Sequence, residues 1–479
     1  MGMEAFLRIV SIPAPAIGHR LGMGRCDRMR AVAWPRISSM MAIGLFVALA
    51  ALLRSFSYLF SPVIRWSTLT VAAREGVVLP LLVLAVAMAL LGRVYGADNL
   101  VVGRLCVKGS FRVLVRQMGI CCLSGIIGYA AGLLPLTVRI AMGADYGGPD
   151  ILALLSTLTT LSSLTIVASV MGAVIASRWM VIILPLGMLA VLVIGPLLTD
   201  TILVNTGRSA LLPAPVWNND FPSLGWTIEP MVAVYRAVFF VVIAMASLKV
   251  GRYVLDGVNA WRWTRDPVLV SCSIIAVIMA FAPLALPMAL VRGDGQSMVC
   301  SQTSRQVVVC VHPADRNLLG DIANAGYSVL DLAPQTRVTL REHVGGTPWD
   351  SDAGTAIFAT PANGMSRAAL TKEIQRAVAE TVTGSAQCAV VHSSLEGSRE
   401  LTEGERVLDI VRQEILIRLG SADPNGVNVE TGDRVYRSSS DFASALGEYT
   451  DAQFADWFTE HREILQSCTA SEAQVMPAG

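Results

Sequence analysis

The sequence predicts a polytopic α-helical membrane domain followed by a soluble α/β or α+β domain outside the membrane. Of its 479 residues, 53% are hydrophobic and only 15% are charged, a balance too apolar for one large soluble fold. The two parts also differ in charge. Residues 1–292 hold 23 Lys and Arg against 11 Asp and Glu, whereas residues 293–479 hold 14 against 25. The chain therefore divides near residue 293.

Residues 1–38 form a basic segment that we expect to lie in the cytoplasm. Three prolines interrupt it before the first long apolar run, so no cleavable signal peptide is predicted. The first spanning helix is expected to insert as its own signal. The arginines of this segment are Arg8, Arg20, Arg25, Arg28, Arg30 and Arg36.

Residues 39–292 are expected to form the membrane domain, because they contain long apolar runs with few charges. A helix needs about 20 apolar residues to cross roughly 30 Å of hydrocarbon, and about seven runs meet that length. The predicted spans lie near residues 39–61, 77–95, 118–138, 151–177, 179–199, 231–248 and 267–291.

The basic residues of the connecting loops predict the orientation, since Lys and Arg are retained preferentially on the cytoplasmic side. With the amino terminus inside, the inner segments carry 16 basic residues. The outer loops carry only Arg65, Arg74, Arg139 and Arg208. An odd number of spans then places the tail outside. We therefore expect a multi-pass protein of the bacterial inner (cell) membrane with an extracytoplasmic carboxy-terminal domain.

Small side chains in the third predicted span favour close helix packing. Ser124, Gly128 and Gly132 follow a small-xxx-small spacing, which lets two helix backbones approach each other closely. We interpret this face as a helix contact within the lipid bilayer.

Hydroxyl side chains mark the fourth predicted span. Ser156, Thr160 and Ser163 fall on one helical face. Two interpretations of this face stay open, tight packing with interhelical hydrogen bonds or the polar lining of a translocation path.

The tail, residues 293–479, has the alternating pattern of a compact domain. A β-branched run at 307–311 predicts a strand, a helix follows it, and further strands are expected at 327–332 and 355–360. Two later helices begin with capping boxes, at Thr402 and Thr450.

Four of the nine cysteines lie in the tail, an even number on the side of the membrane where disulfides form. Four cysteines allow three pairings. We prefer Cys300 with Cys310, which closes a short loop, and Cys388 with Cys468, which ties the last helix to a strand.

The chain carries no recognisable catalytic or nucleotide-binding motif, so we expect it not to be an enzyme. The residues after its three lysines exclude a GxxxxGKS/T phosphate loop, and HExxH, GxSxG and CxxC motifs are missing. The spacing of His and Cys matches no zinc module, and nothing resembles a motif that reads nucleic acid. We therefore expect no metal, no cofactor and no nucleic-acid partner.

A basic segment at residues 96–117 separates the second and third predicted spans. Its basic residues recur every four positions, at Arg104, Lys108, Arg112 and Arg116. One interpretation is cytoplasmic retention with attraction to anionic headgroups. The other is docking on a protein partner, which needs an apolar anchor, and Phe111 is the candidate.

The layout of residues 20–250 resembles the permease subunits of ABC-2-type exporters, particularly the divergent ones of high-GC Gram-positive bacteria. The resemblance rests on the basic amino-terminal segment, the basic loop at 96–117, the long outer segment at 205–230 and the lack of a nucleotide site. It implies that the two cytoplasmic elements contact a separate ATP-binding-cassette ATPase. It also implies a homodimer or heterodimer in the lipid bilayer.

The seventh predicted span and the tail depart from the six-helix layout of that family. The run from Val307 to Pro313 resembles the start of an external domain in uncharacterised permease-like proteins. Two hypotheses follow. The chain is a transport subunit that exports an amphipathic or peptide-like compound with a separate ATPase, or it is a membrane-anchored binding or sensing protein whose helices transmit the state of the tail.

Overall fold

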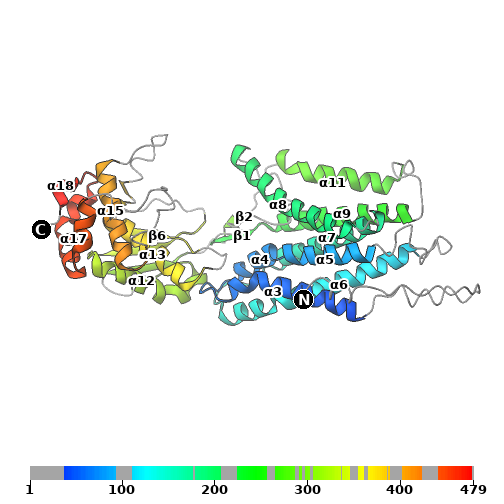
Figure 1. Cartoon of the computed structure of the whole chain (residues 1–479), viewed down its shortest axis with the longest axis horizontal. Coiled ribbons are helices and arrows are strands. Elements are labelled where there is room, and N and C mark those ends of the chain that lie inside the picture. The colour runs from blue at the N-terminus through cyan, green and yellow to red at the C-terminus, as the bar shows by residue number, and fades with distance from the viewer. Residues whose placement is uncertain are drawn as a thin grey trace, which may run out of the picture.

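A body of apolar helices and a mixed α/β domain make up the computed structural model, and a short two-stranded sheet lies between them (Figure 1). The two strands of this sheet are β1 (Trp226–Ile228) and β2 (Val291–Gly293), which pair antiparallel. The structure describes residues 37–92, 110–175, 179–206, 224–255, 265–285, 291–293, 297–302, 306–335, 337–345, 354–360, 365–385, 387–388, 402–422 and 441–476.

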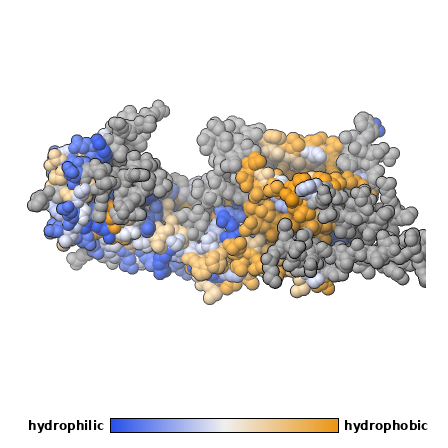
Figure 2. Space-filling model, viewed as in Figure 1, coloured by the Kyte–Doolittle hydropathy of each residue, from blue (hydrophilic) through white to orange (hydrophobic). Residues whose placement is uncertain are grey.

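The apolar body is built from helices whose lipid-facing side chains are hydrophobic. Figure 2 shows this body as a largely hydrophobic surface beside a hydrophilic tail, the distribution that a bilayer requires. Its helices are α3 (Ile37–Leu59), α4 (Trp66–Glu75), α5 (Val78–Gly92), α6 (Ser110–Gly143), α7 (Ile151–Ile175), α8 (Met180–Thr206), α9 (Pro230–Leu255) and α11 (Pro267–Ala285).

Among the described residues, five helical stretches are long and apolar enough to cross a membrane. They are Ile37–Leu59, Trp66–Gly92, Leu114–Gly143, Ile151–Ile175 and Pro230–Leu255. Two further apolar stretches are shorter, Met180–Ile194 in α8 and Pro267–Ala282 in α11. The chain is therefore a membrane protein by the length and composition of its helices.

The second predicted span, 77–95, begins where α5 does, but the observed apolar stretch extends back to Trp66 and is interrupted. Pro80 has no N–H, and its ring excludes the carbonyl four residues earlier, at Gly76, so α4 and α5 are separate helices. The break leaves the Ala73 carbonyl without its helical donor, and the Tyr129 hydroxyl of α6 donates a hydrogen bond to it. A segment expected to be an outer loop is thus a buried short helix, α4.

Helices α3 and α6 cross at very close range. An ideal Cβ on Gly128 would lie 2.2 Å from the carbonyl oxygen of Gly44, and one on Gly132 would lie 2.5 Å from a second α3 carbonyl. The Ser124 hydroxyl donates to a third α3 carbonyl, at 2.6 Å. Only glycine leaves room for the backbone of α3 at these positions.

The tail contains a four-stranded sheet in the order β3-β4-β5-β6. The strands β4, β5 and β6 are parallel, and β3 runs antiparallel to β4. The strands are β3 (Val299–Gln302), β4 (Val307–Val311), β5 (Val338–Glu342) and β6 (Thr355–Phe358). The predicted strand at 307–311 is confirmed, and β6 lies within the strand predicted at 355–360.

Helices cover this sheet and continue to the end of the chain (Figure 1). The strand predicted at 327–332 is wrong, because these residues are the last turns of α12, where Val329, Leu330 and Leu332 pack into the core at helical spacing. The elements are η4 (Pro313–Leu318), α12 (Leu319–Leu332), α13 (Arg367–Thr383), α15 (Glu403–Arg418), α16 (Asp441–Glu448), α17 (Asp451–Gln466) and α18 (Glu472–Val475).

Two disulfide-bonded pairs brace the tail, in the pairing that the sequence favoured. Cys300 and Cys310 lie directly opposite each other on β3 and β4, with their Cα atoms 4.0 Å apart. Cys388 and Cys468 are 80 residues apart in the sequence and join the segment after α13 to the end of α17.

Substituting Gly128→Ala should separate α3 from α6, because the new methyl group would overlap the Gly44 carbonyl. Overpacking of this kind costs about 1–3 kcal/mol, so we expect a lower midpoint of thermal unfolding for the full chain in detergent micelles, followed by circular dichroism. Gly119→Ala on the same helix is the matched control, since no atom lies within 4 Å of its Cβ position. An equal loss of stability in both variants would contradict the tight crossing.

Candidate functional site

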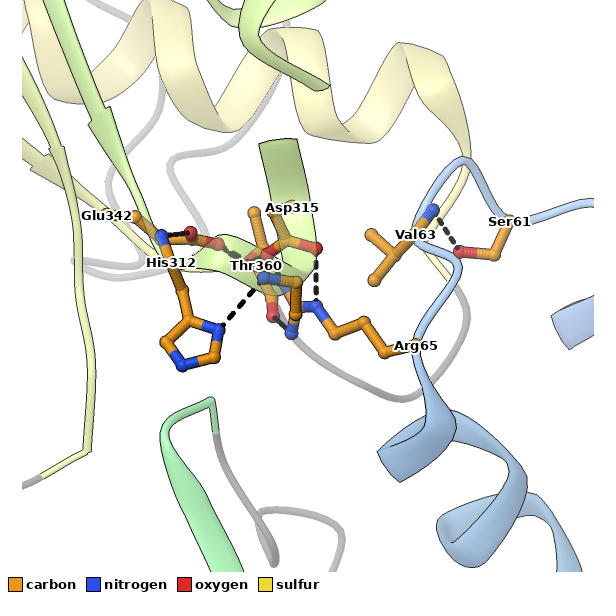
Figure 3. A network of polar contacts seen from close by, with 8 residues as sticks. Ser61, Val63, Arg65, His312, Asp315, Glu342 and Thr360 are labelled. Carbon is orange, nitrogen blue, oxygen red and sulfur yellow. Dashed lines mark hydrogen bonds and ion pairs between the residues drawn. The ribbon is translucent and has the colours of Figure 1, made fainter. Parts of the chain in front are cut away.

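Arg65 joins the membrane helices to the tail. It ends the loop between α3 and α4, residues 60–65, which we call the interface loop, and it forms the N-cap of α4. Its side chain is only 2% exposed because it enters the tail (Figure 3). Its Nε donates to Oδ1 of Asp315 at 2.6 Å, and its Nη2 donates to the other oxygen of that carboxylate. This two-point contact is the geometry in which guanidinium and carboxylate bind most strongly.

Two further residues of the tail complete the contact. The Nη2 of Arg65 lies 3.1 Å from Oε1 of Glu342, and its Nη1 donates to the Thr360 carbonyl at 3.0 Å. The Thr360 hydroxyl accepts from Arg65 and contacts Oε1 of Glu342. We call Asp315, Glu342 and Thr360 the acceptor cluster. Its members are almost fully buried, and all of them face one guanidinium (Figure 3).

The parallel strands explain why the acceptor cluster assembles in one place. Asp315 follows β4 in the turn η4, Glu342 ends β5, and Thr360 comes two residues after β6. The carboxyl ends of parallel strands share one edge of a sheet, and this edge is where open α/β folds bind ligands. Here a residue of the membrane domain occupies it.

His312 fixes the positions of two members of the acceptor cluster, Asp315 and Glu342. It follows β4, and its Nδ1 accepts the backbone N–H of Ala314 at 3.2 Å, which fixes the start of η4 and so the position of Asp315. Its own backbone N–H donates to Oε2 of Glu342 at 2.9 Å. The carboxylate of Glu342 thereby receives hydrogen bonds at both oxygens.

Three segments at one end of the membrane helices meet the tail. From the interface loop, Val63 is buried in the hydrophobic core of the tail. From the loop between α6 and α7, Tyr146 packs edge-on against His312, with 5.3 Å between ring centroids. Just before β1, the Leu224 carbonyl accepts the N–H of Gly345 at 2.8 Å. The Arg65 contact therefore lies within a broader interface.

The electrostatics of the cluster are unbalanced, because two buried carboxylates face one guanidinium. Burial lowers the pKa of Arg65 to about 10, against the opposing attraction of Glu342, so Arg65 stays protonated at neutral pH. Burial also raises the pKa of Glu342, although Arg65, Thr360 and the N–H of His312 act in the opposite direction. Because Arg65 is among the groups that lower the pKa of Glu342, proton uptake at Glu342 weakens the docked state.

The candidate ATPase-docking residues lie far from this interface. Arg104 and Lys108 are outside the described residues, while Phe111, Arg112 and Arg116 lie in the first two turns of α6. Helix α6 has 34 residues and reaches the interface at its other end, a distance of about 50 Å at 1.5 Å per residue. The two regions are at opposite ends of the membrane domain.

The hydroxyl face of the fourth predicted span is buried inside the bundle. Ser156, Thr160 and Ser163 lie in α7, and the Thr160 hydroxyl donates to the Ser156 carbonyl of its own helix at 2.9 Å. The structure therefore places this hydroxyl in a bond within its helix. In the part of the chain that the structure describes, no group of three His, Cys, Asp or Glu side chains is arranged to hold a metal ion.

Sequence reasoning missed the acceptor cluster. It counted Arg65 only as one of the outer-loop basic residues. A signal was present in the tail, since Asp315 and Glu342 each follow or end a β-branched strand, the positions at which parallel sheets carry functional side chains. Nothing in the local sequence linked these acids to residue 65.

Two matched substitutions should have very different effects on docking. Asp315→Asn removes the carboxylate that holds Arg65 at two points, and breaking a buried pair costs about 3–5 kcal/mol. Glu342→Gln should cost less than about 1 kcal/mol, because burial already favours the neutral form of this side chain. Docking can be measured as protection of a cysteine placed at the buried position 63 from a membrane-impermeant maleimide, in the full chain in detergent micelles.

We expect labelling at position 63 to be about a hundredfold faster or more with Asp315→Asn and nearly unchanged with Glu342→Gln. In the parent protein, labelling should become faster as the pH falls through the raised pKa of Glu342, because Arg65 holds the ionised carboxylate more tightly than the protonated one. Glu342→Gln should remove that part of the pH dependence. Equal labelling of the two variants would contradict the unequal roles of the acids.

The contacts of Arg65 with the acceptor cluster are the basis for interpreting this site. Their geometry is that of a guanidinium bound by two carboxylates, a hydroxyl and a carbonyl at the edge of a parallel sheet. No known family model, no curated protein and no solved structure significantly matches this chain.

Proposed function

We propose that this chain is a membrane-anchored extracytoplasmic binding and sensing protein, whose tail docks on the outer loops and transmits its state to the helices. The observation that carries the proposal is the buried contact of Arg65 with the acceptor cluster. A buried ion pair is either made or broken at high cost, so it favours two discrete arrangements over a gradual one. Such a contact suits a switch between a docked and an undocked tail.

The membrane side of the contact supports transmission. Arg65 begins α4, and Glu75 ends that helix at the break before α5. One oxygen of Glu75 accepts from Arg54 at 2.9 Å and from the Tyr58 hydroxyl at 2.7 Å, which ties α4 to α3. A displacement of Arg65 would therefore act on both helices through a continuous set of hydrogen bonds.

The proposal includes the orientation predicted from the loops, with seven spans, the amino terminus inside and the tail outside in a bacterial cell membrane. The distribution of basic residues supports it. The disulfide-bonded pairs of the tail also support it, because such pairs persist in oxidising compartments.

Transmission can be tested with a spin label on a cysteine at Val115, a partly exposed residue near the inner start of α6. We expect Arg65→Gln to undock the tail and to change the mobility of the label. Arg412→Gln is the matched control, since Arg412 pairs with Glu380 and Asp409 inside the tail. Undocking at position 63 without any change at the label would contradict the sensing role.

A second candidate function is a transport subunit, energised by a separate ATP-binding-cassette ATPase and working as a homodimer or heterodimer. The observation that favours it is the interrupted stretch α4–α5, which buries the charged residues Arg74 and Glu75 within a segment apolar enough to span the membrane. Broken helices and buried ionisable residues mark the binding sites of many transporters. The exported compound would be amphipathic or peptide-like.

The transport candidate predicts that Phe111 anchors the ATPase. Phe111→Ala should reduce copurification of an ATPase encoded beside this gene by about tenfold or more, because an apolar anchor in a cleft contributes about 2 kcal/mol or more to binding. Val115→Ala, which shortens an exposed apolar side chain one turn later on the same helix, is the control. Copurification that falls with salt but not with Phe111→Ala would leave only an electrostatic contact and contradict docking.

A further inference from the structure

We propose that the acceptor cluster is a guanidinium-binding site, that Arg65 is its internal occupant, and that the tail recognises an arginine side chain when the interface loop withdraws. This inference rests on the proposed sensing function and names its ligand class. It follows from what the cluster binds, how its members are held, and where the occupant comes from.

The cluster matches a guanidinium rather than any cation. Its contacts reach all three nitrogens of Arg65, with Asp315 on Nε and Nη2, the Thr360 carbonyl on Nη1, and Glu342 on Nη2. This arrangement fits the planar fork of donors in arginine, whereas the single ammonium group of lysine could satisfy only part of it. The binding chemistry is therefore specific for the group and not only for its charge.

The tail holds this shape without help from Arg65. Asp315 is positioned by η4 and its His312 cap, Glu342 by its place in β5 and by the N–H of His312, and Thr360 by the end of β6. The three acceptors belong to one sheet, whereas the occupant comes from a loop 250 residues earlier than Asp315. Withdrawal of Arg65 would leave two buried carboxylates without a cation, which strongly favours binding of another guanidinium.

The tether of Arg65 sets the strength of competition. A group on the same chain acts at an effective concentration in the millimolar range or above, so a free guanidinium competes poorly with it. A natural ligand would therefore need contacts beyond the guanidinium itself. Removing the Arg65 side chain removes the competitor and makes the site measurable with a small probe.

The test uses the full chain with Arg65→Ala in lipid nanodiscs, titrated with ethylguanidinium. We expect saturable binding by calorimetry and an increase in the midpoint of thermal unfolding, neither of which occurs with ethylammonium. The parent protein should respond only at much higher probe concentrations, because the tethered Arg65 occupies the site. Adding Asp315→Asn to Arg65→Ala should weaken binding by at least about 30-fold, since truncating one partner of a buried charge pair costs about 2 kcal/mol or more.

Arg139→Ala is the matched control for a missing outer arginine. The Arg139 guanidinium donates to the Ser61 carbonyl of the interface loop at 2.6 Å, and among the described residues it pairs with no carboxylate. It should show no saturable response to ethylguanidinium. Absence of saturable binding to folded Arg65→Ala, or equal responses of Arg65→Ala and Arg139→Ala, would overturn the proposal.

If Arg65→Ala does not fold, the parent chain with a cysteine at position 63 replaces it. Ethylguanidinium should then accelerate maleimide labelling of that buried position by displacing Arg65, and ethylammonium at the same concentration should not. Equal labelling with the two probes would overturn the proposal in this format.

Two further probes distinguish the sources of the arginine group. Tighter binding of free L-arginine than of N-acetyl-argininamide would assign the site to the amino acid, and the reverse order would assign it to an arginine within a peptide. Binding without any change in the Val115 spin label would refute the sensing function while the ligand class stands. A label that responds to undocking without any guanidinium binding would refute the ligand class alone.

Discussion

The position of the tail depends on one desolvated charge. A guanidinium removed from water is stable only where several acceptors replace its hydration, and Arg65 finds them at a single edge of the tail sheet. That requirement fixes the position of the interface loop and therefore the start of α4. It also places Val63, a residue of the membrane domain, in the hydrophobic core of the tail. The ring contact of Tyr146 with His312 and the hydrogen bond from Gly345 to the Leu224 carbonyl add to the interface.

Buried backbone groups in the membrane domain also depend on contacts from neighbouring helices. Where Pro80 interrupts the second spanning stretch, the freed Ala73 carbonyl is satisfied by a tyrosine of the neighbouring helix. Where α3 and α6 touch, glycine removes every side-chain atom that would separate two backbones. Both solutions make the helices dependent on their neighbours, so α3, α4 and α6 are built as one connected unit.

Local patterns predicted much of this fold and little of its site. The apolar helices at 37–59, 151–175 and 230–255 follow directly from hydropathy, and the capping boxes at Thr402 and Thr450 have the expected hydrogen bonds. The predicted second span, 77–95, begins where α5 does, but helix α4 was missed because Arg65, Arg74 and Glu75 are typical of a loop between spans. The Arg65 contact was missed for a different reason, since hydropathy and charge are read within short windows and 250 residues separate its two partners.

The tail has two attachments of different kinds, the small sheet of β1 and β2 and the Arg65 contact. Strand β1 leads into α9 and β2 follows α11, so their pairing joins these two helices at the end that faces the tail. Strand β2 precedes the tail in the chain, so this covalent connection persists when the Arg65 contact is lost. Arg65 is the second attachment and the only one of the two that a competing ligand could release. Loss of the Arg65 contact would therefore swing the tail about a hinge rather than set it free, and its return would be a unimolecular event, independent of how much protein the membrane contains.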